Sequence, residues 1–242
     1  MDYQNILFKN YNATRTTFLD PNDEIKFEWF KNYYQKIYKN YFVNINKKSK
    51  ILELGCNKGF LLKTFEEQGY SNLYGVDLSK DDLDSAKLII PTAKLYQQDV
   101  FEFLKNNKNS FDIIILKALI EHIKKEKILE FLELINNSLT PGGMVLIDVQ
   151  NSAWLWGLHD RYVDFTHEVG FTQESLRQVM LLHFNKVQVT PTKSPLGPMG
   201  RKDRIKHFIA KKIFFFLCKW ADPESPSIQE RLLIATGKKQ NL

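Results

Sequence analysis

Histidine and carboxylate side chains occur together in two segments of the sequence, where they are placed to move protons. Glu121 and His122 follow an apolar run, and His159, Asp164 and His167 lie in a second segment farther along the chain. Histidine takes up a proton near neutral pH, and a positioned base accelerates a reaction by about 10²–10⁴-fold. His167 is our first candidate for such a base, with His122 and Asp164 as the alternatives.

Aromatic and basic side chains surround the second of these segments. From Trp154 to Glu168 the chain reads WLWGLHDRYVDFTHE. Aromatic rings suit the apolar faces of a sugar ring, and an arginine can hold a phosphate or a carboxylate through two parallel hydrogen bonds. The candidate substrate-binding residues in this segment are Trp154, Trp156, His159, Arg161 and Tyr162. Two structural interpretations stay open: the rings pack this loop onto the sheet, and His167 only caps loop backbone.

A glycine turn follows the first apolar run of the central part of the chain. Residues 51–60 read ILELGCNKGF, which predicts a strand, a tight turn and a helix, and doubly wound sheets bind nucleotides at such a turn. Glycine at positions 55 and 59 lets a ligand lie against bare backbone. Asn57 and Phe60 stand where a dinucleotide fingerprint needs glycine or alanine. A ligand without a pyrophosphate therefore fits this turn better.

Two acids close the next two predicted strands. Asp77 ends the second strand, where a carboxylate can accept hydrogen bonds from both hydroxyls of a ribose. Asp99 ends the third strand, where it is placed to bind an exocyclic adenine amine while the N–H of Val100 meets a ring nitrogen. In this order, the acids and the glycine turn indicate a site for a nucleoside.

These features resemble the class I S-adenosylmethionine-dependent methyltransferases, over about residues 49–190 and the final strand. The matching segments are ELGCNKG, the acids in Val76-Asp77-Leu78 and Gln98-Asp99-Val100, the Glu121-His122 pair, and Pro141-Gly142-Gly143 before the fifth core strand. The resemblance implies that S-adenosylmethionine is the cofactor and S-adenosylhomocysteine the product. The cofactor-binding residues it implies are Glu53, Gly55, Asn57, Gly59, Asp77, Leu78, Asp99, Val100 and Lys117.

The resemblance also assigns places to these residues. Glu53 and Gly55 lie beside the methionine part of the cofactor, Leu78 packs on the adenine, and the backbone of Lys117 or Ala118 lines the sulfonium side. Asn57 stands where the family commonly has a middle glycine.

A finer resemblance concerns the acceptor. The string R-Y-x-D-F-T-H-E followed by Phe171-Thr172 is similar to that of bacterial methyltransferases encoded with surface-polysaccharide enzymes. It implies O-methylation of a sugar, a sugar nucleotide or a related phosphorylated intermediate in capsule or lipopolysaccharide synthesis. Two alternatives stay open: a small aromatic or isoprenoid acceptor, with an aromatic N-terminal helix as pocket wall, and a non-catalytic cofactor-binding protein.

No metal requirement is predicted from the sequence. Some members of the family hold a divalent metal ion through E-x-x-E-H after the fourth strand, but this chain has Ala118 at the first position of that motif. Glu121 and His122 alone are two ligands on adjacent residues, with no third in sight. The pair can instead orient the loop after the strand.

The elements that must position these residues follow an α/β pattern. Beyond residue 50, short apolar runs alternate with helical periodicity, which is typical of a parallel sheet with crossover helices. Strands are expected at 51–54, 73–77, 94–97, 112–116, 144–149, 186–190 and 232–236. The predicted fold is a Rossmann-like, seven-stranded, mostly parallel sheet. The predicted units are a helical cap at 1–48, a cofactor-binding core at 49–190, a basic helical insertion at 191–228, and the last strand and tail at 229–242.

Four local features are predicted within these units. An aromatic helix is expected at about 21–42, and Ser79 and Thr172 should each begin a helix as the N-terminal cap. Pro141-Gly142-Gly143 should form a turn between a helix and the next strand.

Charge concentrates in one segment of the 242-residue chain. The net charge is +6. Residues 201–220 alone sum to +6, because they contain seven lysines and arginines and one aspartate. The periodicity of this segment predicts a helix with an apolar face. Four roles stay open for it: it covers part of the sheet, forms a dimer contact, touches a membrane surface, or binds an anionic acceptor. Nucleic acid is not expected as a partner. We expect a cytoplasmic protein, because neither a secretory signal nor a membrane span is apparent. We also expect a monomer or a homodimer.

Overall fold

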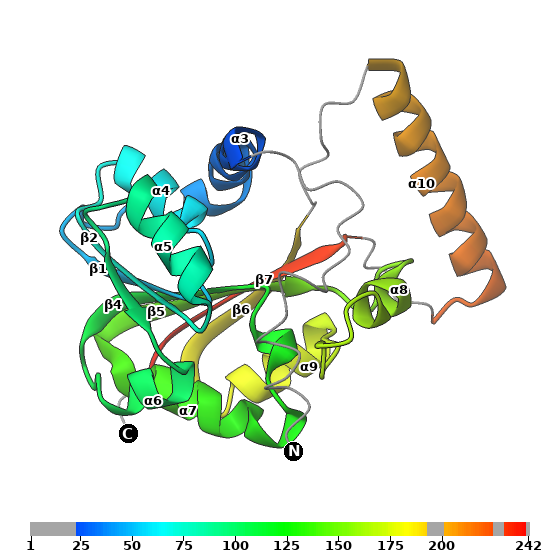
Figure 1. Cartoon of the computed structure of the whole chain (residues 1–242). Coiled ribbons are helices and arrows are strands. Elements are labelled where there is room, and N and C mark those ends of the chain that lie inside the picture. Colours follow the sequence, from blue (N-terminus) through cyan, green and yellow to red (C-terminus); the bar gives the residue numbers. More distant parts are fainter. Residues whose placement is uncertain (1–22, 193–200, 225–229, 241–242) are drawn as a thin grey trace.

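One mixed sheet runs through the part of the chain that the computed structural model describes, residues 23–192, 201–224 and 230–240 (Figure 1). Its strand order is β3-β2-β1-β4-β5-β7-β6. The strands are β1 Lys50–Leu54, β2 Asn72–Asp77, β3 Lys94–Gln97, β4 Phe111–Lys117, β5 Leu139–Gln150, β6 Phe184–Thr192 and β7 Leu232–Lys239. Strands β1 to β5 pair in parallel, and β7 is antiparallel to β5 and β6. The predicted fold class is confirmed.

Helices cover both faces of the sheet (Figure 1). They are α3 Asp23–Tyr33, α4 Phe60–Glu67, α5 Lys80–Ile89, α6 Val100–Lys105, α7 Ile128–Ser138, α8 Gly157–Tyr162, α9 Gln173–Met180 and α10 Arg201–Ala221. Helices α3, α4 and α5 contribute to one buried apolar cluster, and α6, α7 and α9 contribute to the other. Because both faces are covered, the central strand β4 carries a run of four buried apolar residues from Ile113 to Leu116.

Helix starts follow the predicted capping residues. The hydroxyl of Ser79 accepts a hydrogen bond from the backbone N–H of Asp82 at 3.2 Å, at the start of α5. Thr172 and Ser175 form a reciprocal capping box at the start of α9. Both predicted starts are confirmed.

The aromatic segment before the sheet is helical in three parts. Helix α3 continues into a π-helical turn, η1 Tyr34–Tyr38, and a 3₁₀ turn, η2 Lys39–Tyr41. A π turn relates residues five apart along the chain, so it brings Tyr33 and Tyr38 to one side, where both are fully buried. The sequence predicts one helix at about 21–42. Its first two residues belong to the segment 1–22, which lies outside the described part of the chain.

Three elements differ from the sequence prediction, one of them the short helix α6, which was not predicted. Pro141-Gly142-Gly143 is no turn before the strand but part of β5, because pairing with β4 jumps from Phe111–Leu139 to Ile113–Met144 as a bulge. Gly142 adopts a φ of +78° there, which favours glycine. The short helix α8 was not predicted.

Helix α10 lies apart from the layers of the sheet (Figure 1). One ion pair, Lys211 Nζ to Glu230 Oε1 at 2.9 Å, joins it to the chain before β7. The rest of the predicted insertion at 193–200 and 225–228 lies outside the described residues, and the domain boundaries stay predictions. No helix in the described segments is long and apolar enough to cross a membrane.

Candidate active site

The glycine turn after β1 is shaped by backbone conformations that favour glycine. Gly55 and Gly59 have φ values of +71° and +75°. The N–H groups of Gly55 and Cys56 both donate to the carbonyl of Val76, at 2.8 and 3.1 Å, which fixes the turn against β2. A side chain at Gly59 would crowd Ala86 at 3.2 Å. The turn therefore holds bare backbone at the carboxyl edge of the sheet.

Asp77 closes β2 beside this turn. Its carboxylate accepts hydrogen bonds from the backbone N–H groups of Asn57 and Ser79, at 2.8 and 2.9 Å. Burial raises the pKa of Asp77, and these two hydrogen bonds oppose the rise. The next residue, Leu78, leaves 52% of its surface exposed. An oriented carboxylate and an exposed apolar side chain thus lie next to each other.

Asp99 has a structural role that the sequence analysis missed. Its Oδ1 accepts hydrogen bonds from the N–H groups of Phe101 and Glu102, at 2.9 and 3.2 Å, and so caps the N-terminus of α6. The adenine contacts expected of Asp99 and Val100 stay predictions.

Lys117, at the end of β4, faces the N-terminal aromatic helix. Its Nζ lies 3.5 Å from Oδ2 of the buried Asp148 and 4.4 Å from the ring centre of Tyr33. The hydroxyls of Tyr33 and Tyr38 donate to the same Oδ2, at 2.5 and 2.7 Å. Lys117 therefore helps to hold the aromatic helix over the carboxyl edge of the sheet.

The three candidate bases gather in one place. The rings of His122 and His167 lie 4.8 Å apart between centroids. The hydroxyl of Thr166 lies 2.8 Å from Nδ1 of His122 and donates to Oδ1 of Asp164 at 2.6 Å. Nδ1 of His167 lies 3.0 Å from the carbonyl oxygen of Asp160. The fold thus joins the two histidine segments of the sequence.

Glu121 lies in the same group and bears on whether the group can hold a metal ion. It is 3% exposed, and burial raises its pKa to about 8. Ligand atoms of Glu121, His122 and His167 all lie within 4.8 Å of one another. The prediction of no metal rested on the lack of a third ligand, and His167 supplies one.

A pocket of about 500 Å³ opens beside this group. It is lined by Arg161, Tyr162, Asp164, Phe165, His167 and Glu168. Tyr162 and Phe165 are 70% and 81% exposed. Arg161 donates from Nη2 to the carbonyl of Glu168 at 2.7 Å. Two of the predicted acceptor-binding residues thus line the pocket with two of the candidate bases.

The other predicted acceptor residues are not among those that line this pocket. Trp156 and His159 are exposed, and Trp154 is half-buried. Their acceptor-binding role stays a prediction.

One residue pair that positions the pocket loop was missed. The buried Asp160 accepts two hydrogen bonds from Arg231, from Nε and Nη2, each at 2.9 Å. The pair fixes α8 to the chain before β7. No local pattern signals it, because the partners are far apart in sequence.

A family model described as a methyltransferase domain matches residues 27–186, which is well over half of the chain. The chain belongs to this methyltransferase family.

Curated proteins are similar to part of this methyltransferase. A ubiquinone biosynthesis O-methyltransferase of Bartonella tribocorum is 30% identical over 112 residues, 45% of this chain and 44% of that enzyme. The chain thus spans about half the length of the curated relatives it matches.

Solved structures show the same fold. An S-adenosylmethionine-dependent methyltransferase from Archaeoglobus fulgidus superposes with a TM-score of 0.66 at 20% identity, over 88% of this chain and 94% of that one. Phosphoethanolamine N-methyltransferase 2 of Haemonchus contortus, solved with S-adenosyl-L-methionine, gives 0.65 at 17% identity, over 97% and 60%. The chain therefore has the fold of S-adenosylmethionine-dependent methyltransferases.

The methyltransferase has groups that fit this cofactor. Glu53 is buried, and its Oε2 has no hydrogen-bond partner among the described residues. Burial raises the pKa of Glu53, and the charge of Lys117 opposes the rise. A buried acceptor that lacks a donor suits the charged amino group of the methionine part, while Asp77 and Leu78 suit the ribose and the adenine. The contacts themselves stay predictions.

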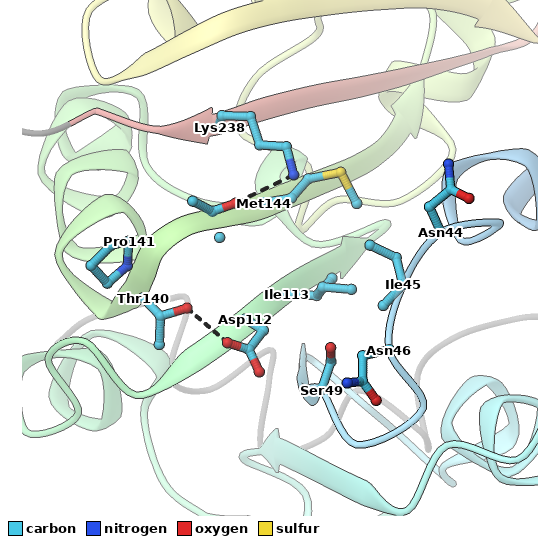
Figure 2. Close-up of a pocket in the computed structure, with 12 residues that line it drawn as sticks. Asn44, Ile45, Asn46, Ser49, Asp112, Ile113, Thr140, Pro141, Met144 and Lys238 are labelled. Atoms are coloured by element: carbon cyan, nitrogen blue, oxygen red, sulfur yellow. Dashed lines mark hydrogen bonds between the residues drawn. The ribbon is translucent and has the colours of Figure 1, made fainter.

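A second hollow of the methyltransferase, about 230 Å³, lies at the opposite edge of the sheet (Figure 2). Asp112 accepts hydrogen bonds there from the hydroxyl of Thr140 at 2.8 Å and the N–H of Lys50 at 2.9 Å. Lys238 donates to the carbonyl of Gly142 at 3.3 Å. Open α/β sheets bind ligands at the carboxyl ends of their strands. We therefore interpret this hollow at the amino ends as structural.

Proposed function

We propose that this methyltransferase transfers a methyl group to a hydroxyl of a small aromatic or isoprenoid acceptor. The observation that carries the proposal is the pocket in which the exposed rings of Tyr162 and Phe165 lie beside His167 and Asp164. An apolar acceptor would cover these rings while its hydroxyl meets the histidine. The Bartonella tribocorum relative, named as an O-methyltransferase of ubiquinone biosynthesis, supports this class of acceptor.

The residues around the pocket suit proton removal. S-adenosylmethionine, when bound, supplies a methyl group on a sulfonium that is open to in-line attack. The carbonyl of Asp160 can only accept, so Nδ1 of His167 carries the ring proton and Nε2 carries the lone pair. In this proposal Nε2 would take the proton of the acceptor hydroxyl as the oxygen bonds to the methyl carbon, while the bond from that carbon to the sulfonium sulfur breaks and leaves S-adenosylhomocysteine. Alignment of a bound acceptor with the reacting carbon can contribute about 7–11 kcal/mol.

A sugar hydroxyl in surface-polysaccharide synthesis is the second candidate acceptor. Arg161 in the pocket wall favours it, because a guanidinium can hold a phosphate or a carboxylate. In the structure Arg161 already donates to Glu168 and lies over the ring of Tyr162, 4.9 Å from its centre. That engagement makes the apolar acceptor our first choice.

The test is a mass-spectrometric methyl-transfer assay with purified protein. The acceptors are catechols with and without an isoprenoid chain, set against sugar nucleotides and sugar phosphates. We expect a gain of one methyl group on a catechol, at least about 100-fold slower in His167→Ala, because a positioned base contributes about that much or more. His183→Gln, whose histidine lies outside the pocket, should keep the wild-type rate.

The outcomes separate the three interpretations. Methylation of sugar compounds alone would replace the apolar acceptor with the polysaccharide function. Binding of S-adenosylhomocysteine without turnover on any acceptor would favour a non-catalytic role.

We also propose that α10 contacts an anionic membrane surface. Its exposed apolar side chains include Ile205, Ile209, Ile213, Phe216, Leu217 and Trp220. Lys202, Lys206 and Lys212 on the same helix are exposed as well. At 100° per residue these lysines fall among the apolar side chains, and a helix surface that carries both kinds suits the boundary between lipid headgroups and acyl chains. The cytoplasmic location and the oligomeric state stay predictions.

A further inference from the structure

One carboxylate and two imidazoles converge beside the acceptor pocket from two separate segments. Glu121 and His122 lie in the 3₁₀ turn Ile120–His122 after β4, and His167 lies in the loop after α8. The N–H groups of Glu168 and Val169 both donate to the carbonyl of Glu121, at 2.7 and 3.2 Å. These backbone bonds fix the two segments to each other, so the convergence is built into the fold.

Hydrogen bonds set the tautomer of His122. Thr166 donates its hydroxyl proton to the carboxylate of Asp164 at 2.6 Å, so its oxygen serves as the acceptor toward His122. Nδ1 of His122 therefore carries the ring proton, and the lone pair lies on Nε2.

Backbone carbonyl groups set the same tautomer in His167. Its Nδ1 lies 3.0 and 3.3 Å from the carbonyl oxygens of Asp160 and Arg161, which can only accept. The lone pair of His167 therefore also lies on Nε2. A neutral imidazole whose other nitrogen donates to a protein oxygen is the arrangement of metal-binding histidines.

Glu121 supplies an independent observation. Both of its carboxylate oxygens are buried and have no hydrogen-bond partner among the described residues, and the side chain is 3% exposed. A buried carboxylate without a donor is costly, and a cation beside it removes that cost. The geometry thus provides an unpartnered carboxyl group, which a bound cation would keep ionised, next to two nitrogen lone pairs.

We propose that Glu121, His122 and His167 bind a divalent transition-metal ion such as Zn²⁺. Two imidazoles and one carboxylate suit zinc and its neighbours, whereas magnesium and calcium prefer oxygen ligands. Asp164 and Thr166 orient His122 from behind without touching the ion. Three protein ligands leave a coordination position open, as catalytic zinc sites do.

The metal site deepens the proposed function and rests on it for its catalytic role. Because His167 and Asp164 line the acceptor pocket, the open position is available to an acceptor hydroxyl. Coordination lowers the pKa of a bound hydroxyl, whose proton then passes to water before the methyl group is transferred. With the ion bound, His167 acts as a ligand and no longer takes the proton itself.

The first measurement is metal binding, which does not depend on turnover. Full-length protein treated with EDTA is titrated with Co²⁺, and the visible d–d bands of the ion are followed. We expect one saturable site, with Zn²⁺ displacing Co²⁺. Glu121→Gln, His122→Ala and His167→Ala should each weaken Co²⁺ binding by at least about 100-fold. Thr166→Val, which keeps all three ligands, should weaken it by about 10-fold.

His183→Gln is the matched control and should bind Co²⁺ as the wild type does. Thermal unfolding of each variant shows whether it is folded. Absence of saturable Co²⁺ binding in the wild type, or unchanged binding in folded Glu121→Gln and His167→Ala, overturns the metal site. Methyl transfer by EDTA-treated protein would then leave the proposed function intact, with His167 as the base.

Activity separates the metal site from the proposed function. We expect EDTA to abolish methyl transfer to the preferred acceptor and Zn²⁺ to restore it. Saturable Co²⁺ binding with turnover unaffected by EDTA overturns the catalytic role of the ion. Saturable Co²⁺ binding without turnover on any acceptor counts against the proposed function, and the site itself stands.

Discussion

The buried carboxylates at the carboxyl edge of the sheet differ in whether protein donors satisfy them. Asp77 receives two backbone N–H groups, whereas Glu53 and Glu121 keep buried oxygens without a donor among the described residues. Burying an unsatisfied acceptor costs about 1–3 kcal/mol. At this scale the pattern points to groups from outside the chain: the cofactor at Glu53 and a metal ion at Glu121.

Asp77→Asn tests the cofactor site at the residue scale. Asparagine of the same shape lacks the charge and one of the acceptor oxygens. Hydrogen bonds to charged groups are worth about 1.5–3 kcal/mol, so the Kd for S-adenosylhomocysteine in isothermal titration should rise by about 10-fold or more. Asp84→Asn, at an exposed position of α5 where the side chain forms an ion pair with Lys87, is the control and should bind normally. Equal affinity in Asp77→Asn would contradict the ribose assignment.

At the scale of elements, the π turn after α3 decides how the N-terminal aromatic helix docks. In a continuous α-helix, residues five apart point about 140° away from each other. The π turn brings Tyr33 and Tyr38 together, and both donate to Asp148 at the carboxyl end of β5. The aromatic helix is thus attached to the sheet through a buried carboxylate that also faces Lys117.

Tyr38→Phe tests this attachment. Loss of one donor to a buried carboxylate should lower the free energy of unfolding by about 1.5–3 kcal/mol, and Tm should fall by about 2–4 °C per kcal/mol. Urea unfolding followed by circular dichroism measures the change. Because Tyr33 and Tyr38 share one oxygen, the double variant Tyr33→Phe/Tyr38→Phe should not be additive. Tyr96→Phe, which is partly exposed, should have the wild-type stability, and a Tyr38→Phe protein that matches it would disprove the attachment.

At the scale of the whole molecule, one helix outside the sheet layers, α10, combines a net positive charge with exposed apolar side chains. The apolar side chains of α10 are exposed on a helix that lies apart from the core (Figure 1). An interfacial helix of this kind would keep the enzyme at the surface where an isoprenoid acceptor resides.

Vesicle co-sedimentation tests the membrane contact. The protein should bind phosphatidylglycerol-containing vesicles, bind phosphatidylcholine vesicles weakly, and dissociate as salt screens the lysines. Ile209→Glu combined with Trp220→Glu should reduce the bound fraction at least about 10-fold. Leu88→Glu, at an apolar position of α5 that is 86% exposed, should leave binding unchanged. Equal binding of Ile209→Glu/Trp220→Glu and Leu88→Glu would refute a contact through α10.

The sequence by itself determined what local chemistry decides. Alternating apolar runs predicted the seven strands, because covered parallel strands need continuous apolar residues. Ser79 and Thr172 marked helix starts, because their hydroxyls satisfy backbone N–H groups only a few residues away. The glycine turn and Asp77 indicated a nucleoside site, because the order of strands places them on one edge.

The tertiary structure alone decided how distant residues combine. Local patterns do not indicate that His167 meets Glu121 and His122, that Arg231 holds Asp160, or that Tyr38 reaches Asp148. Each of these contacts joins segments far apart in the chain. It forms only when packing of the sheet brings those segments together. A ligand set or a buried ion pair assembled in this way becomes visible only once the chain is folded.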